Sequence, residues 1–325
     1  MFKKFRGIIK VISCLSAISC AEASSIKEVL LGCLKVPRVP LRNLATQANS
    51  LAVLSEIHTS HLGEKLSTWK NLEIQGLTPH KLEELFKNQI PAIRVRNFLS
   101  VSQCERLVSA AEQLGFDYYE NVTPPIGRIG ITQFESSQKE PETYFDKVKE
   151  ACAKRDEVYS AAGTDVLESV IKVVRSVSSL QAGVAHDSLR GEYFAGLIRQ
   201  INQAHLHFDF AKFDAPGWHI SGVEQQLSWN IYVSIPQRGG ELVVHELPWE
   251  EEIYEKFLLP GHSGSYGFEK ELVSNVRRVD ITPEIGDLVV FNTRNFHEVK
   301  TGEGKRISIS SFFGKHSNGK IVFWS

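Results

Sequence analysis

The chain has 325 residues and a mass of 36.5 kDa, which is enough to bury one large core. Its formal net charge is -1 and its pI is near 6.8, and the absence of a long basic run with interleaved aromatic residues gives no indication of a nucleic-acid partner. The hydrophobic fraction of 42% and the charged fraction of 23% are those of an ordinary globular protein.

The first 25 residues are predicted to form a leader or targeting segment. Four Lys and Arg side chains lie within the first ten residues and precede a short apolar stretch, residues 11–21, that serines interrupt. This order resembles a secretory signal, and a transit peptide or a basic helix fits it equally. The stretch is too short to span a membrane. The three cysteines after it, at 33, 104 and 152, have no disulfide-framework spacing, which favours a cytoplasmic location and leaves secretory or organellar targeting open.

Helix signals dominate the next part of the chain. Residues 26–89 are predicted to be a helical N-terminal extension, with Thr78 capping a helix that has Pro79 at its first position. The residues 102–105 fit a capping box for a second helix, and Gly115 fits its end. Two more helices are expected over 141–155 and 165–177.

Strand signals dominate the remainder. The segments 204–210, 227–234, 241–245 and 285–291 are rich in β-branched, aromatic and aliphatic residues. A turn over 236–240, with Gly239 and Gly240, is predicted to join the second and third of these strands. The segment 247–279 predicts a long loop, which is a candidate cover for an active site because loops of that length are usually functional or disordered.

The most informative residues lie in the first of these strands. His207 and Asp209 are two residues apart, and side chains at i and i+2 of a strand point to the same face. His297 follows ninety residues later, just after the strand that ends at Phe291. Two histidines and one carboxylate, with other positions left open, form the facial triad of non-haem iron(II) oxygenases. The pattern therefore predicts that these three residues bind a catalytic metal.

Two more residues fit a co-substrate site. Arg306 lies nine residues after His297, and Ser308 follows it. A guanidinium can hold a carboxylate through two parallel hydrogen bonds, and a hydroxyl can add a further donor. We predict that Arg306 and Ser308 bind the distal carboxylate of 2-oxoglutarate.

These elements resemble the Fe(II)/2-oxoglutarate-dependent oxygenase superfamily, in the branch related to prolyl 4-hydroxylases. The resemblance covers about residues 90–313 and is carried, in order, by His207-x-Asp209, Gly239-Gly240-Glu241-Leu242, Pro283-x-x-Gly286-Asp287 leading to His297, and Arg306-x-Ser308. A second resemblance, to enzymes that hydroxylate or halogenate free amino acids, is carried by the segments 208–211 and 226–232.

The resemblance implies a mainly β fold with flanking helices, a distorted double-stranded β-helix or jelly roll, over residues 90–325. It implies Fe(II) as cofactor, 2-oxoglutarate and O2 as co-substrates, and oxidation of an unactivated C–H bond. Related halogenases have glycine or alanine in place of the carboxylate ligand, so Asp209 favours hydroxylation, or a desaturation that begins with the same hydrogen abstraction, over halogenation.

Other interpretations remain open. A three-histidine cupin site formed by His205, His207 and His297 would leave Asp209 and Arg306 without a role, and it lacks the glutamate that such sites place about four residues after the second histidine. His205 is therefore predicted to lie in the outer shell of the metal site or in the substrate pocket. A jelly roll that binds a metabolite without catalysis is the alternative of another class.

The substrate is predicted to be a small polar molecule, a free amino acid or a close derivative. Arg128, Glu192 and Arg199 lie in pocket-like contexts, and an arginine and a glutamate would suit the carboxylate and amine of such a ligand; His205 completes the predicted substrate residues. Ordinary surface salt bridges explain the charged residues equally well. Action on a peptide or protein, as in prolyl hydroxylases, is the alternative.

Overall fold

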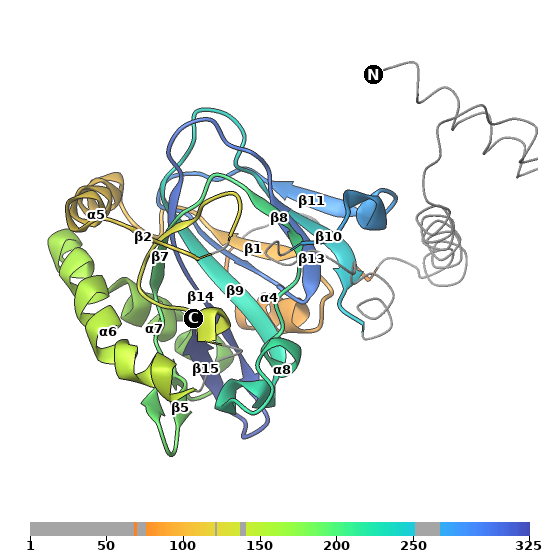
Figure 1. Cartoon of the computed structure of the whole chain (residues 1–325). Coiled ribbons are helices and arrows are strands. Elements are labelled where there is room, and N and C mark those ends of the chain that lie inside the picture. Colours follow the sequence, from red (N-terminus) through yellow and green to blue (C-terminus); the bar gives the residue numbers. More distant parts are fainter. Residues whose placement is uncertain (1–67, 70–75, 121, 137–140, 251–266) are drawn as a thin grey trace, which may run out of the picture. The chain divides into compact units, whose positions relative to one another are not determined.

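The computed structural model describes residues 68–69, 76–120, 122–136, 141–250 and 267–325 (Figure 1). The predicted leader and most of the predicted extension lie outside these ranges. No described helix is long and apolar enough to cross a membrane. The described helices are α4 (Pro79–Phe86), α5 (Val101–Leu114), α6 (Glu142–Ala162), α7 (Val166–Ser178), α8 (Ala211–Asp214) and the short 3-10 helices η1 (Gln133–Ser136), η2 (His219–Gly222) and η3 (Lys270–Val273).

Two facing sheets form the core of the described residues. The larger has nine strands in the order β1-β12-β9-β14-β7-β3-β2, with β15 paired to β14 and β4 paired to β15, and the smaller has four in the order β11-β10-β13-β8. A separate pair, β5–β6, lies apart from both sheets. The strands of the large sheet are β1 (Ala92–Val95), β2 (Asp117–Tyr118), β3 (Gly127–Ile129), β4 (Ala182–Val184), β7 (Leu197–Gln200), β9 (Val223–Ser234), β12 (Leu288–Phe291), β14 (Ile307–His316) and β15 (Ile321–Trp324). The others are β5 (His186–Asp187), β6 (Gly191–Glu192), β8 (Ala204–His207), β10 (Leu242–Pro248), β11 (Arg278–Ile281) and β13 (Asn295–Val299).

From β7 to β14 the chain crosses between the two sheets at each step except the one from β10 to β11, which are neighbours in the small sheet. β7, β9, β12 and β14 belong to the large sheet, whereas β8, β10, β11 and β13 belong to the small one. This connection gives the double-stranded β-helix that the sequence predicted. It also brings β8 beside β13, so that segments ninety residues apart in sequence become neighbours.

Helices cover the outer face of the large sheet, and the small sheet covers the other face (Figure 1). Alternate residues of β9, such as Trp229 and Ile231, pack with apolar residues of α4, α5 and α7. Because side chains alternate along a strand, Tyr232 points the opposite way and packs with residues of β10 from the small sheet. The inner face of the large sheet therefore faces the small sheet.

A row of polar side chains crosses this inner face. Ser308 of β14 is paired with Tyr232 of β9 and with Arg199 of β7, and Arg199 is paired with Arg128 of β3. Directly paired residues of antiparallel strands project from the same face. The register thus places the side chains of Ser308, Arg199 and Arg128 on the inner face of the large sheet, which faces the small sheet.

Local signals gave most helix boundaries. Thr78 caps α4 as predicted, and Gly115 ends α5. The predicted capping box at 102–105 was wrong, because Ser100 is the cap and exchanges hydrogen bonds with Gln103. Ser102 has the same side chain and could cap a helix two residues later. Because β1 has already ended before Ser100, the helix starts at Ser100, the first of the two caps. The third predicted helix, 141–155, continues as α6 to residue 162.

The glycine turn between β9 and β10 forms as predicted. Gly239 and Gly240 both have positive φ, at 71° and 76°, and a Cβ atom on Gly239 would collide with the carbonyl oxygen of Thr301. Of the predicted loop over 247–279, residues 251–266 lie outside the described part of the chain. The described remainder includes η3 and the start of β11.

Candidate metal centre

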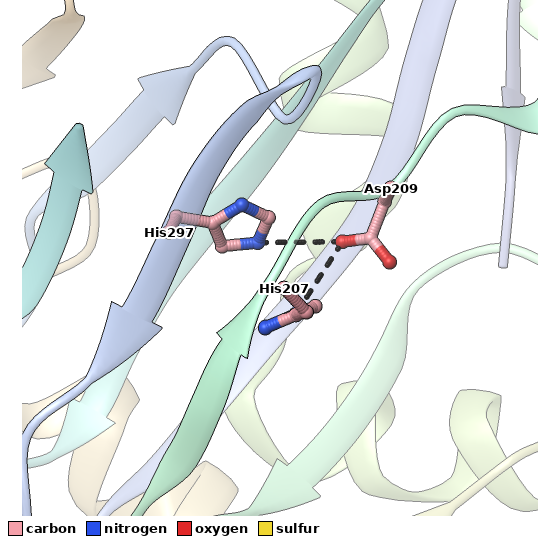
Figure 2. A group of neighbouring side chains, drawn as sticks. All are labelled: His207, Asp209 and His297. Carbon is pink, nitrogen blue, oxygen red and sulfur yellow. Dashed lines mark ion pairs between the residues drawn. The ribbon is translucent and has the colours of Figure 1, made fainter. Parts of the chain in front are cut away.

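Three side chains from two neighbouring strands converge at one point. His207 ends β8, Asp209 lies two residues beyond it, and His297 lies on β13 directly opposite His207 (Figure 2). Asp209 Oδ2 lies 3.3 Å from His297 Nε2 and 3.7 Å from His207 Nε2. The three ligand atoms all lie within 4.8 Å of one another. The structure therefore assembles the predicted triad.

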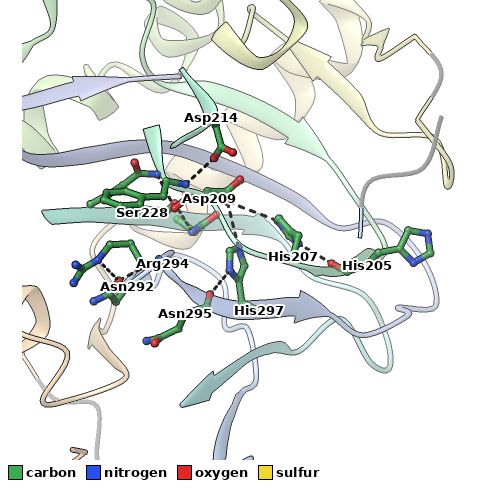
Figure 3. A network of polar contacts seen from close by, with 12 residues as sticks. His205, His207, Asp209, Asp214, Ser228, Asn292, Arg294, Asn295 and His297 are labelled. Atoms are coloured by element: carbon green, nitrogen blue, oxygen red, sulfur yellow. Dashed lines mark hydrogen bonds and ion pairs between the residues drawn. The ribbon is translucent and has the colours of Figure 1, made fainter. Parts of the chain in front are cut away.

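Backbone carbonyls orient both imidazoles. His207 Nδ1 lies 2.7 Å from the carbonyl oxygen of His205, and His297 Nδ1 lies 2.9 Å from that of Asn295 (Figure 3). Nδ1 can satisfy these carbonyls only as a donor, so Nε2 carries the lone pair in the neutral ring. Such a contact fixes the ring of a metal-binding histidine. In both histidines Nε2 is the atom that faces Asp209.

The protonation states also suit metal binding. Burial, followed by the nearby His297, lowers the pKa of His207 to about 4. Burial by itself would raise the pKa of Asp209, but the adjacent His207 and His297 outweigh it and hold this pKa below its usual value. At neutral pH the site therefore presents a neutral imidazole at His207 and an ionised carboxylate at Asp209, which are the forms that bind a metal.

The donor set fits Fe(II). Neighbouring ligand atoms of an octahedral first-row metal lie about 3 Å apart, close to the separations from Asp209 Oδ2 to the two imidazole nitrogens. His207, Asp209 and His297 would hold the ion from one side, which would leave the rest of its coordination sphere for 2-oxoglutarate and O2.

The backbone of Asp209 is held in place from two sides. Its N–H donates to the carbonyl oxygen of Thr293 at 2.9 Å, and its carbonyl accepts from Gln226 Nε2 at 3.1 Å. Gln226 is buried, and its Oε1 accepts from the N–H of Ala211 at 2.7 Å. Gln226 lies in the segment 226–232 that carries the second resemblance, but no role was predicted for it. A signal was present, because polar residues alternate with apolar ones from Gln226 to Val233.

Aromatic residues support the ligands from behind. Leu206, Phe208 and Phe296 alternate with the ligands and therefore point to the opposite face, where they pack with Trp249 and Phe268. The rings of Phe208 and Phe296 meet edge to face with centroids 5.5 Å apart. This cluster fixes β8 against β13 directly beneath the metal site.

Arg306 and Ser308 lie at the inner face of the large sheet, as the predicted co-substrate site requires. Arg306 is 3% exposed, its guanidinium lies 5.0 Å from the ring centre of Tyr232, and its Nη1 donates to the carbonyl oxygen of Ile201 at 3.4 Å. Among the described residues no carboxylate forms an ion pair with it, and burial lowers its pKa. A buried cation of this kind requires an anionic partner.

The two predicted substrate arginines differ in their surroundings. Arg128 Nη2 lies 2.6 Å from Glu135 Oε1, its Nη1 donates to the carbonyl oxygen of Gly130, and its guanidinium lies over the ring of Tyr119. Arg199 forms no ion pair with any described carboxylate, and its buried Nε has no hydrogen-bond partner there. Arg199 is therefore the better placed of the two to bind an anion.

The other two predicted substrate residues occupy different places. His205 Nε2 lies 3.0 Å from the carbonyl oxygen of Thr123, and its own carbonyl orients His207, which agrees with a place in the outer shell. Glu192 is exposed on β6. Burial is the main cause that raises the pKa of the Cys152 thiol on α6, and the charge of Glu192 adds to it. The structure does not place Glu192 with the triad, and a substrate role for it stays a prediction.

Asp214 is a carboxyl group beside the triad that was not among the predicted site residues. Asp214, at the end of α8, accepts a hydrogen bond from the N–H of Phe210 at 2.8 Å (Figure 3). Desolvation, to which the charge of Asp209 adds, raises its pKa to about 7. Asp214 therefore carries only part of a negative charge near neutral pH.

Comparison with known proteins agrees with this site. The sequence profile of the family described as carrier-protein-independent halogenase WelO5 matches residues 66–325. Leucinostatins biosynthesis cluster protein S of Purpureocillium lilacinum is 38% identical over 223 residues, which cover 64% of this chain and 90% of that protein. L-gamma-glutamyl-L-propargylglycine hydroxylase of Streptantibioticus cattleyicolor is 23% identical over 270 residues, which cover 80% of this chain and 97% of that protein.

A solved structure supports the fold. An N-substituted L-amino acid dioxygenase from Burkholderia ambifaria superposes with a TM-score of 0.50 and 12% sequence identity, over 76% of this chain and 91% of that one. With the assembled triad, these relationships confirm an Fe(II)- and 2-oxoglutarate-dependent oxygenase with a jelly-roll core. The family match agrees with the resemblance to halogenases that the sequence carries, and a relative named as an amino-acid-derivative hydroxylase agrees with the resemblance to hydroxylases. The chain belongs to the family described as carrier-protein-independent halogenase WelO5.

Proposed function

We propose that the protein hydroxylates an unactivated C–H bond of a free amino acid or a small amino-acid derivative. The observation that carries the reaction type is the complete His207–Asp209–His297 triad. Although the family takes its name from a halogenase, Asp209 occupies the position that a halide would need, and its backbone is braced on both sides. The hydroxylase of S. cattleyicolor, which is similar along most of this chain, supports a substrate of amino-acid type.

The reaction balances without further reagents. One O2 molecule, one 2-oxoglutarate and one C–H bond give succinate, CO2 and one C–OH group. O2 is the oxidant and 2-oxoglutarate supplies two of the electrons; bound iron would activate the O2, and the protein supplies binding and orientation. His207, Asp209 and His297 hold the ion at one face, while Arg306 and Ser308 hold the distal carboxylate of 2-oxoglutarate. The ring centre of Tyr232 lies 5.0 Å from the guanidinium of Arg306, and Tyr232 is paired across the sheet with Ser308, so Tyr232 borders the proposed carboxylate site.

The test is a screen for substrate-dependent release of succinate. Protein reconstituted with Fe(II), 2-oxoglutarate and O2 is offered L-amino acids, γ-glutamyl amino acids and short peptides, each in chloride-containing and chloride-free buffer. We expect an amino acid or derivative to gain one oxygen atom, with the same product in both buffers. A chlorinated product would contradict the assigned role of Asp209. Turnover of peptides alone would contradict the substrate class and favour a prolyl-hydroxylase-like activity.

A further inference from the structure

Arg199 remains without an anionic partner after the metal and the co-substrate have been placed. It lies on β7 in the same cross-strand row as Ser308, on the face that looks toward the small sheet and the triad. Its neighbour in that row, Arg128, is already neutralised by Glu135. No described carboxylate forms an ion pair with Arg199, and its Nε is buried and has no hydrogen-bond partner among the described residues.

Its position in the sheet places this guanidinium near the reaction site. Arg199 is paired with Ser308 of β14, and Ser308 is paired with Tyr232 of β9, whose ring centre lies 5.0 Å from the guanidinium of Arg306. The face that carries this row looks toward the small sheet, in which β8 and β13 hold His207 and His297 side by side. Arg199 therefore lies in the same row as the predicted co-substrate residue Ser308 and on the face that looks toward the triad.

The charges of the loaded site do not balance without another anion. Iron(II) brings two positive charges, and Arg199 and Arg306 bring two more. Asp209 and the two carboxylates of 2-oxoglutarate bring three negative charges. One carboxylate of 2-oxoglutarate would bind the metal and the other would bind Arg306, so the loaded site would keep one positive charge in excess. An uncompensated guanidinium in a partly buried site is costly, and a carboxylate is the group that suits its fork of donors.

We infer that Arg199 binds a carboxylate of the primary substrate, so that the substrate enters the site as an anion and presents its C–H bond beside the metal. This inference rests on the proposed function and narrows its substrate class. It separates substrate recognition from co-substrate recognition: the substrate anion binds on β7, and 2-oxoglutarate binds at the start of β14. Arg128 is the neighbour of Arg199 in the row and borders this site, but its own charge is already paired with Glu135.

The experiment compares binding of acids with binding of their neutral amides. The anaerobic Fe(II)–2-oxoglutarate complex is titrated with L-amino acids and γ-glutamyl amino acids, each as the free acid and as the primary amide. The change in the metal-to-ligand charge-transfer band reports binding without turnover. The variants are Arg199→Met, which removes the charge, and Arg199→Lys, which keeps it. Arg96→Met, at an exposed arginine paired with Glu284, controls for loss of one positive charge elsewhere.

We expect the parent protein to bind at least one acid roughly 30-fold more tightly than its amide, as for loss of a desolvated charge pair. Arg199→Met should abolish this preference while the 2-oxoglutarate affinity stays within about two-fold, and Arg199→Lys should keep part of it. Equal acid preference in Arg199→Met and parent overturns the inference, as does a parent that binds no acid better than its amide. A large loss of 2-oxoglutarate affinity in Arg199→Met assigns the residue to the co-substrate instead. Failure of the proposed function is distinct, because then no compound stimulates succinate release.

Discussion

Each metal ligand has a separate structural support, so the chemistry of the site can be tested residue by residue. His207 and His297 are oriented by the carbonyls of His205 and Asn295, and Asp209 is held through its backbone. Arg306 lies just before β14 of the other sheet, where its guanidinium contacts the carbonyl oxygen of Ile201 and the ring of Tyr232. Metal binding and co-substrate binding should therefore respond to different substitutions.

Alanine at His207, Asp209 or His297 should abolish iron binding and all decarboxylation of 2-oxoglutarate. Arg306→Ala should leave iron bound but weaken the binding of 2-oxoglutarate by about 2–5 kcal/mol, because one side of a buried charged pair is lost. This is a roughly 30- to several-thousand-fold loss in affinity. Ser308→Ala should cost about 1 kcal/mol, since one neutral donor is lost. Anaerobic titration with Fe(II) and then with 2-oxoglutarate separates the two steps. A His297→Ala variant that still formed the charge-transfer complex would show the triad to be wrong.

At the scale of elements, the short stretch after β8 determines where the carboxylate ligand lies. β8 ends at His207, so Asp209 is no longer held by the ladder of the small sheet. The turn between β12 and β13 and the side chain of Gln226 on β9 take over that role. The turn is fixed in its own place, because Asn292 and Arg294 donate to carbonyl oxygens at the end of α4. A helix on the outer face thus contributes to the geometry of the metal site.

Gln226→Met removes both amide hydrogen bonds at nearly constant volume and should lower Fe(II) affinity by roughly 10- to 100-fold, as for other outer-shell partners of metal ligands. Gln225→Met, one position away on the other face of β9, is the matched control and should keep the parent affinity. Fe(II) titration and thermal unfolding are measured together for both variants. Equal iron affinity in Gln226→Met and parent would mean that the amide supports only the fold, with Asp209 held adequately by Thr293.

For the whole molecule, the core extends to residues before the first strand. Trp69 is 2% exposed and packs between β1, β10 and β12. Its backbone N–H donates to Glu246, its indole donates to Asn88, and Arg277 donates to its carbonyl oxygen. The family match begins at residue 66, just before this tryptophan. The predicted boundary between an extension and a domain at residue 90 stays a prediction, but α4 and Trp69 pack with the same sheets as the residues after it.

Trp69→Ala should lower the free energy of unfolding by about 3–5 kcal/mol, because a large buried side chain is replaced by a cavity and Asn88 loses the hydrogen bond from the indole. Trp69→Phe should cost less, since most of the ring volume remains. Urea unfolding of both variants, with the parent slope as a check on two-state behaviour, gives the values. A loss below about 1 kcal/mol for Trp69→Ala would show that Trp69 is not part of the stabilising core.

The sequence by itself determined the chemistry and the approximate elements. The spacing of His207 and Asp209, the distance from His297 to Arg306, and the glycine turn at Gly239 and Gly240 are local patterns, so they are readable without a fold. Helix ends set by Thr78 and Gly115 were predictable for the same reason, because capping depends on a few adjacent residues. The capping box was misplaced because two nearby serines offer the same chemistry.

Only the tertiary structure decided which of the candidate residues act together. The pairing of His207 with His297 depends on the register between β8 and β13, which is set by contacts between segments ninety residues apart. Arg128 and Arg199 are equivalent in sequence terms, and only the fold shows that one is neutralised and the other faces the metal site without a counter-ion. Charge compensation depends on distances across the sheets, and spacing along a single strand does not fix those distances.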